Sequence, residues 1–126
     1  MYDERMMLRT VLVSSVVLAS LAAPRPGNAH HSFAAEYDAD QPITLTGKVT
    51  RIDLINPHAW VYIDVVDDDG ALVHWNIEMG APNSLIRRGI TRDTVPVGTE
   101  VTVDGYRAKD GSNTVNSRTI TLGSCS

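Results

Sequence analysis

The most distinctive chemical groups of this chain are its four histidines, His30, His31, His58 and His74. His30 and His31 directly follow Gly27-Asn28-Ala29, a run of small residues typical of a signal-peptidase cleavage site. Cleavage after Ala29 would give His30 a free α-amine, so that its amine and its imidazole could chelate one ion together. Nitrogen donors in such a tetragonal arrangement favour Cu(II). The sequence therefore predicts a site for copper, or alternatively zinc, at the processed N-terminus, unless these histidines form a solvated tail.

His58 is the expected further ligand of this site, beside His30 and His31. It follows the turn signal Asn56-Pro57 and precedes Trp60, on which we expect Phe33 of the N-terminal arm to pack. His74 is excluded from the site. At about 3.3 Å per strand residue, His58 lies about 20 Å from the position that faces His74.

The N-terminal 29 residues read as a signal peptide, with Arg5 and Arg9 before an apolar run over residues 11–23. This run is too short to span a bilayer. We expect a periplasmic or secreted bacterial protein without a stable membrane span after cleavage. The net charge of −4 argues against nucleic acid as a partner. The single cysteine, Cys125, cannot form an internal disulfide.

The remaining chain divides into an arm over residues 30–42 and a β-barrel domain over residues 43–126. Residues 43–54, 59–67, 71–79, 99–107 and 118–122 show strand patterns, with a short helix after Pro82 that ends at Gly89. A slip of the apolar phase near Arg51 indicates a bulge in the first strand. Three strands, a helix and two strands are the order of an OB-like Greek-key barrel, so we predict an all-β, five-stranded fold of this kind. An open β-sandwich is the alternative.

Core matching sets the register of the second and third strands, because a slip of one residue would turn every side chain over. A loop at residues 68–70 pairs Val61 with Ile77 and Ile63 with Trp75 on the inner face, with Asp64 beside His74 on the outer face. We expect Val61, Ile63, Val65, Trp75, Ile77, Val101 and Val103 inside the barrel. The outer face then carries an exposed group of Trp60, Tyr62, Asn76 and Glu78, which resembles a binding surface unless the arm covers it.

Long motifs of this chain resemble a family of exported bacterial proteins of unknown function. These are His30-His31-Ser32-Phe33-Ala34-Ala35-Glu36-Tyr37-Asp38, Asn56-Pro57-His58-Ala59-Trp60, Glu78-Met79-Gly80-Ala81-Pro82, Arg87-Arg88-Gly89 and residues 105–111. The resemblance covers about residues 30–122. It implies an exported small β-barrel and no settled activity.

Three functions agree with these patterns. The first is a binding or carrier module for copper or zinc, with the metal ion or a periplasmic protein as its partner. The second is an adaptor that recognises a peptide, a glycan or a protein through the outer aromatic face. The third is a mono-copper oxidative enzyme. The residues favour a binding module over an enzyme, because no catalytic triad or carboxylate pair can be placed.

Overall fold

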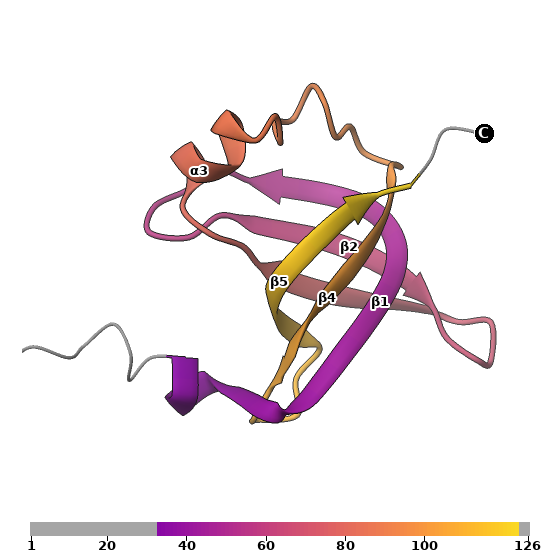
Figure 1. Cartoon of the computed structure of the whole chain (residues 1–126). Coiled ribbons are helices and arrows are strands. Elements are labelled where there is room, and N and C mark those ends of the chain that lie inside the picture. Colours follow the sequence, from indigo (N-terminus) through magenta and orange to yellow (C-terminus); the bar gives the residue numbers. More distant parts are fainter. Residues whose placement is uncertain (1–32, 124–126) are drawn as a thin grey trace, which may run out of the picture. The chain divides into compact units, whose positions relative to one another are not determined.

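A computed structural model describes residues 33–123 of the chain. Its elements are β1 (Tyr37–Asp53), β2 (Trp60–Val66), β3 (Leu72–Glu78), α3 (Pro82–Arg87), β4 (Glu100–Ala108) and β5 (Thr114–Leu122). The five strands form a closed barrel in the order β1-β2-β3-β5-β4 (Figure 1). The predicted OB-like five-stranded barrel, with one helix between the third and fourth strands, is therefore confirmed.

The long strand β1 closes the barrel because it pairs with β4 along its first part and with β2 along its last part. In Figure 1 it sweeps around the side of the barrel. The predicted bulge lies between Val49 and Arg51. Gly47 permits the close approach of β2, since a Cβ atom there would lie 2.4 Å from the backbone oxygen of Asp64.

The first strand begins earlier than the sequence pattern predicts. Residues 37–42 were expected in the arm, but β1 starts at Tyr37, which pairs with Ala108 of β4. The pairing is irregular between Tyr37 and Pro42. The polar residues between them carry no apolar alternation, which explains why the sequence does not indicate a strand there.

The β2–β3 hairpin has the predicted register. Val61 faces Ile77, Ile63 faces Trp75 and Asp64 faces His74. The loop ends at Gly70, whose φ of 82° is a left-handed conformation that favours glycine. A one-residue error in this register would have placed the core residues on the outer face.

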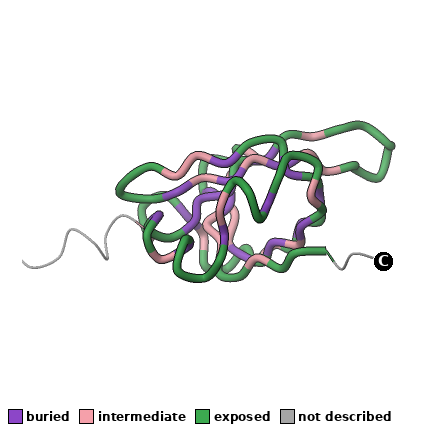
Figure 2. The backbone as a smooth tube through the Cα atoms, turned by 90° about the horizontal axis from the view of Figure 1, so that it is seen from above, coloured by how far each residue is buried: buried purple, intermediate pink, exposed green. Residues whose placement is uncertain are grey.

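The core fills the barrel and contains six of the seven residues predicted for it. Figure 2 shows where the buried segments of the backbone lie. Val65 is half-buried and packs against this core. Leu85 of α3 joins it, together with Ile90 and Val95 of the segment that follows. Within residues 33–123, no helix is long and apolar enough to cross a bilayer.

Candidate metal-binding site at the barrel mouth

Three side chains from three parts of the chain meet at one end of the barrel. His58 lies in the β1–β2 connection, Glu78 ends β3 and Tyr37 begins β1. The backbone N–H of Ala59 donates to the oxygen of Gly80, and that of Met79 donates to the oxygen of Ala59. These two bonds fix the loop that carries His58 against the end of β3.

Glu78 is the centre of this group. Its Oε1 lies 2.9 Å from Nδ1 of His58, and its Oε2 accepts a hydrogen bond from the hydroxyl of Tyr37. Glu78 is only 8% exposed, and it is the one charged residue buried within residues 33–123. A buried carboxylate is costly unless other groups compensate its charge. Here both of its oxygens have a partner.

Glu78 is buried in agreement with one of two expectations for the outer face. The alternation of β3 places it on that face, opposite Trp60, as expected. The face was expected either to be exposed or to be covered by the arm over residues 30–42, and at Glu78 it is covered by Tyr37. The strand pattern identifies the face of a residue and leaves open whether a distant segment covers it.

Tyr37 is suited to remain a hydrogen-bond donor at neutral pH. Burial raises the pKa of its hydroxyl well above the ordinary value, and the hydrogen bond to Glu78 with the negative charge of that residue raises it further. The ring is held by Phe33, whose centroid lies 5.7 Å away. The importance of Tyr37 was not predicted, because nothing in its local sequence indicates Glu78 as its partner.

The short helical segment over residues 33–36 is tied to the barrel at the same place. Phe33 also makes an edge contact with Tyr106, at 5.8 Å between ring centroids. The backbone N–H of Lys109 donates to the oxygen of Glu36 at 2.9 Å, and its ammonium donates to the oxygen of Ala34. The expected packing of Phe33 on Trp60 is wrong, since the ring partners of Phe33 are tyrosines.

Of the predicted metal ligands, His58 lies in the described part of the chain. Its side chain is 50% exposed. His30, His31 and the predicted cleavage site lie outside the described residues. Within residues 33–123, no three His, Cys, Asp or Glu residues form a group that could hold a metal ion. This part of the chain supplies one exposed imidazole on a buried carboxylate.

His74 is separate from this group and pairs with Asp64, as predicted. Its side chain is 81% exposed. The contact is a surface ion pair, a type that contributes little to stability.

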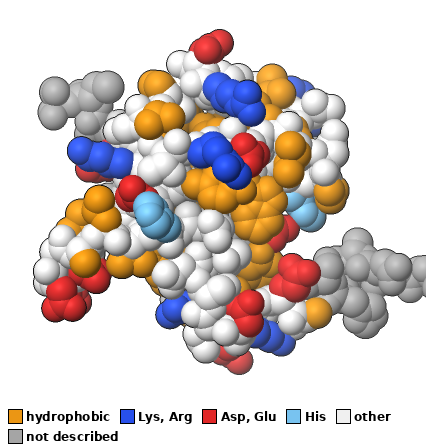
Figure 3. Space-filling view, turned by 180° about the vertical axis from the view of Figure 1, so that it is seen from behind, with side chains coloured by type: hydrophobic (Ala, Val, Ile, Leu, Met, Phe, Trp, Pro, Cys, Tyr) orange, Lys and Arg blue, Asp and Glu red, His pale blue; other side chains and the backbone are white. Residues whose placement is uncertain are grey.

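The predicted outer face is only partly available. Trp60 and Tyr62 are half-buried and Asn76 is exposed. The guanidinium carbon of Arg51 lies 4.2 Å from the centroid of the Tyr62 ring and covers part of it. A groove of about 400 Å³ lies there between β1, β2 and β3. The space-filling view in Figure 3 shows one face of the protein on which hydrophobic side chains gather, with charged groups of both signs around them.

A second groove, of about 600 Å³, lies beside Tyr37, between β2 and the β4–β5 loop. Trp60 lines one part of it, and Glu36 and Asp110 bring two carboxylates. Hydrogen bonds from Ser112 lower the pKa of Asp110, which keeps this carboxylate ionised. The groove therefore combines an aromatic surface with two carboxylates and the ammonium of Lys109.

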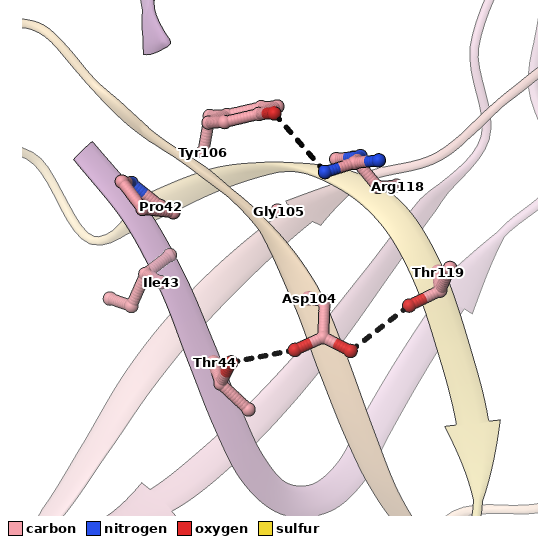
Figure 4. Close-up of a pocket in the computed structure, with 8 residues that line it drawn as sticks. All are labelled: Pro42, Ile43, Thr44, Asp104, Gly105, Tyr106, Arg118 and Thr119. Carbon is pink, nitrogen blue, oxygen red and sulfur yellow. Dashed lines mark hydrogen bonds between the residues drawn. The ribbon is translucent and has the colours of Figure 1, made fainter. Parts of the chain in front are cut away.

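A third groove, of about 520 Å³, crosses β1, β4 and β5 (Figure 4). Asp104 accepts hydrogen bonds from the hydroxyls of Thr44 and Thr119, so it ties three strands together. These bonds hold the pKa of Asp104 below its ordinary value, with that of Thr44 as the larger cause. Arg118 donates to the hydroxyl of Tyr106 at 3.3 Å. This group was not predicted from the sequence.

Comparison with known proteins gives a family without a known activity. No curated protein matches the chain. Among solved structures, the N-terminal domain of the PriB protein from Thermoanaerobacter tencongensis, described as dimeric, matches at 20% identity and a TM-score of 0.46. The match covers 68% of this chain and 98% of that one. At this TM-score we take neither the function nor the assembly of that domain as a guide. The sequence model of a family of unknown function, DUF6152, matches residues 16–117, and the chain belongs to this family.

Proposed function

We propose that this protein is an exported binding module for a copper ion, or alternatively zinc, in which His58 is a ligand together with His30 and His31 of the processed N-terminus. One observation carries the proposal. His58 is half-exposed at the mouth of the barrel, while its Nδ1 lies against the buried carboxylate of Glu78. Imidazoles that bind metals commonly have a carboxylate next to the ring nitrogen that does not bind the metal.

The way in which the first described residues are attached supports the same proposal. Phe33 stacks on Tyr37, Tyr37 donates to Glu78 and Glu78 contacts His58. A continuous series of contacts therefore links the start of the described chain to the proposed ligand. His31 precedes Phe33 by two residues in the sequence.

The proposed role is to carry or buffer the ion. Binding needs neutral imidazoles and a neutral amine, so that the affinity falls on acidification. An oxidative reaction at the same copper ion would require groups that act on a substrate, and we assign none. Export follows from the predicted signal peptide, and N-terminal sequencing of the protein from its native host tests the cleavage after Ala29.

The experiment is a Cu(II) and Zn(II) titration of four proteins by calorimetry. They are the processed protein, the same protein with one glycine added before His30, His58→Ala, and His74→Ala as the matched control. We expect the added glycine and His58→Ala each to weaken binding strongly. The loss should exceed the decrease of about 10–100-fold that is typical when a residue behind a metal ligand is changed. His74→Ala should bind as the unmodified protein does. Equal affinity in all four proteins would refute the site.

An adaptor function is the second candidate, and the groove beside Trp60 favours it. Its volume of about 600 Å³ lies in the usual range for small-ligand sites. Loops and strands in this region of OB barrels bind oligonucleotides or oligosaccharides. The carboxylates of Glu36 and Asp110 outnumber the one ammonium of the groove, that of Lys109, and disfavour a polyanion. Among a peptide, a glycan and a protein as ligands of the adaptor, we propose an uncharged glycan.

Trp60→Ala is the informative variant for this second candidate. It should abolish the NMR shift changes that soluble glycan fragments cause in the groove and leave the Cu(II) affinity unchanged. Arg51→Ala, on the neighbouring groove, is the control. The absence of glycan-dependent shifts in the unmodified protein would eliminate this candidate.

A further inference from the structure

We infer that Tyr37 and Glu78 are positioning residues that keep His58 protonated at Nδ1, which leaves Nε2 as the nitrogen that binds the ion. The inference rests on the proposed function and deepens it. It specifies the ligand atom, and it assigns a role to Tyr37. It can also be tested in the protein without metal.

The contact between His58 and Glu78 selects the tautomer. A neutral imidazole carries one proton, on Nδ1 or on Nε2. With the proton on Nδ1, the 2.9 Å approach of Oε1 of Glu78 is attractive. With the proton on Nε2, Nδ1 would carry a lone pair instead of a hydrogen at 2.9 Å from a negatively charged oxygen, which is less favourable. The carboxylate therefore favours the form in which Nε2 has the free lone pair.

Tyr37 keeps the carboxylate in place. Its hydroxyl donates to Oε2, so that Oε1 is the oxygen turned toward His58. Tyr37 is 4% exposed and Glu78 is 8% exposed, which leaves little space for the carboxylate to rotate. The packing of Phe33 on the ring of Tyr37 restrains the hydroxyl in turn.

The negative charge of Glu78 has a further effect on the ligand. A carboxylate behind an imidazole raises the basicity of the coordinating nitrogen and fixes the ring orientation. The half-exposed ring of His58 then needs no large reorganisation when an ion arrives. Loss of the Tyr37 hydroxyl should weaken binding although Tyr37 does not touch the ion.

The first measurement is ¹⁵N NMR of the His58 ring in the metal-free, processed protein at about pH 8, above the unperturbed histidine pKa of about 6.5. We expect the Nδ1–H form in the unmodified protein and a mixture of both forms in Tyr37→Phe. Tyr106→Phe is the matched control. It removes the hydroxyl of another tyrosine that packs on Phe33, but this hydroxyl contacts Arg118. It should leave the tautomer of His58 unchanged.

The second measurement is a Zn(II) titration of the same proteins, with the coordinating nitrogen identified from the ¹⁵N shifts. We expect coordination through Nε2 and a loss of affinity of about 10–100-fold in Tyr37→Phe and in Glu78→Gln, and none in Tyr106→Phe. Glu78→Gln serves as the second variant if Tyr37→Phe does not fold, which thermal denaturation will show.

The outcomes separate the inference from the proposed function. An Nε2–H tautomer in the unmodified protein overturns the inference, whether or not the protein binds zinc. An unchanged tautomer and an unchanged Zn(II) affinity in Tyr37→Phe overturn the role of Tyr37. Failure of the proposed function appears differently, as Cu(II) and Zn(II) affinities that do not respond to His58→Ala.

Discussion

Replacement of Ile63 by alanine tests the barrel core most directly. Ile63 is 1% exposed, lies opposite Trp75 and belongs to the largest fully buried side chains. The substitution removes three carbon atoms, and at about 0.8 kcal/mol for each the lost transfer free energy is about 2.4 kcal/mol. The cavity left behind adds to this loss, because the closed sheet around it cannot collapse freely. We expect a total destabilisation of about 2.5–5 kcal/mol.

Urea unfolding followed by tryptophan fluorescence measures this effect, since the substitution leaves both tryptophans in place. For a domain of this size, 1 kcal/mol corresponds to a shift in Tm of about 4–8 °C, so that Tm should fall by at least about 10 °C. Val66→Ala on the same strand is the control, because Val66 is 64% exposed. It should change stability by less than about 0.5 kcal/mol. Equal effects of the two substitutions would refute the register of the β2–β3 hairpin.

Three further predictions concern close packing and pH. Gly105→Ala should strongly lower Tm, because its Cβ would lie 2.1 Å from the backbone oxygen of Asn116, whereas Gly80→Ala has open space and should be tolerated. The raised pKa of Tyr37 means that its contribution to stability is complete below the unfolded pKa of 10.0 and is lost as the pH rises toward its folded value. Denaturation curves above pH 10 should therefore show a steeper loss of stability in the unmodified protein than in Tyr37→Phe, and parallel curves would contradict this. The lowered pKa of Asp104 has the opposite sign, with a contribution that is present above the unfolded pKa of 3.8 and lost as the pH falls through the folded value. Asp104→Asn should lower Tm at neutral pH and flatten its dependence on pH below the unfolded pKa of 3.8, and a Tm that varies with acid as before would refute the assignment.

The hairpin was predictable because both of its strands alternate strictly and one register alone brings their apolar residues together. The bulge of β1 was predictable for a related reason, since the apolar phase slips at Arg51. The ends of the barrel strands were harder to predict from the sequence. β5 was expected at Arg118 but begins at Thr114, where a parallel pairing with Asn76 of β3 sets in. That pairing is long-range, and the local pattern contains no sign of it.

The candidate site, like the fold, was predictable from the sequence only in part. The sequence indicated His58 through its turn and its distance from His74, and the structure agrees on both placements. It left open whether the arm covers the outer face, and it could not indicate that Tyr37 in particular contacts Glu78, because 41 residues separate the two and neither has an unusual neighbour. Burial by a distant segment depends on the path of the whole chain.

The pairing of β1 with β4 bears on when the protein can fold. Thr44 and Asp104 are 60 residues apart in the sequence, and the barrel cannot close before β4 has been made. Contacts of such separation form slowly. If the proposed export takes the chain across a membrane in unfolded form, this order of events favours it. Strand β1 lacks its partner β4 until most of the chain has been made, and the barrel stays open until then.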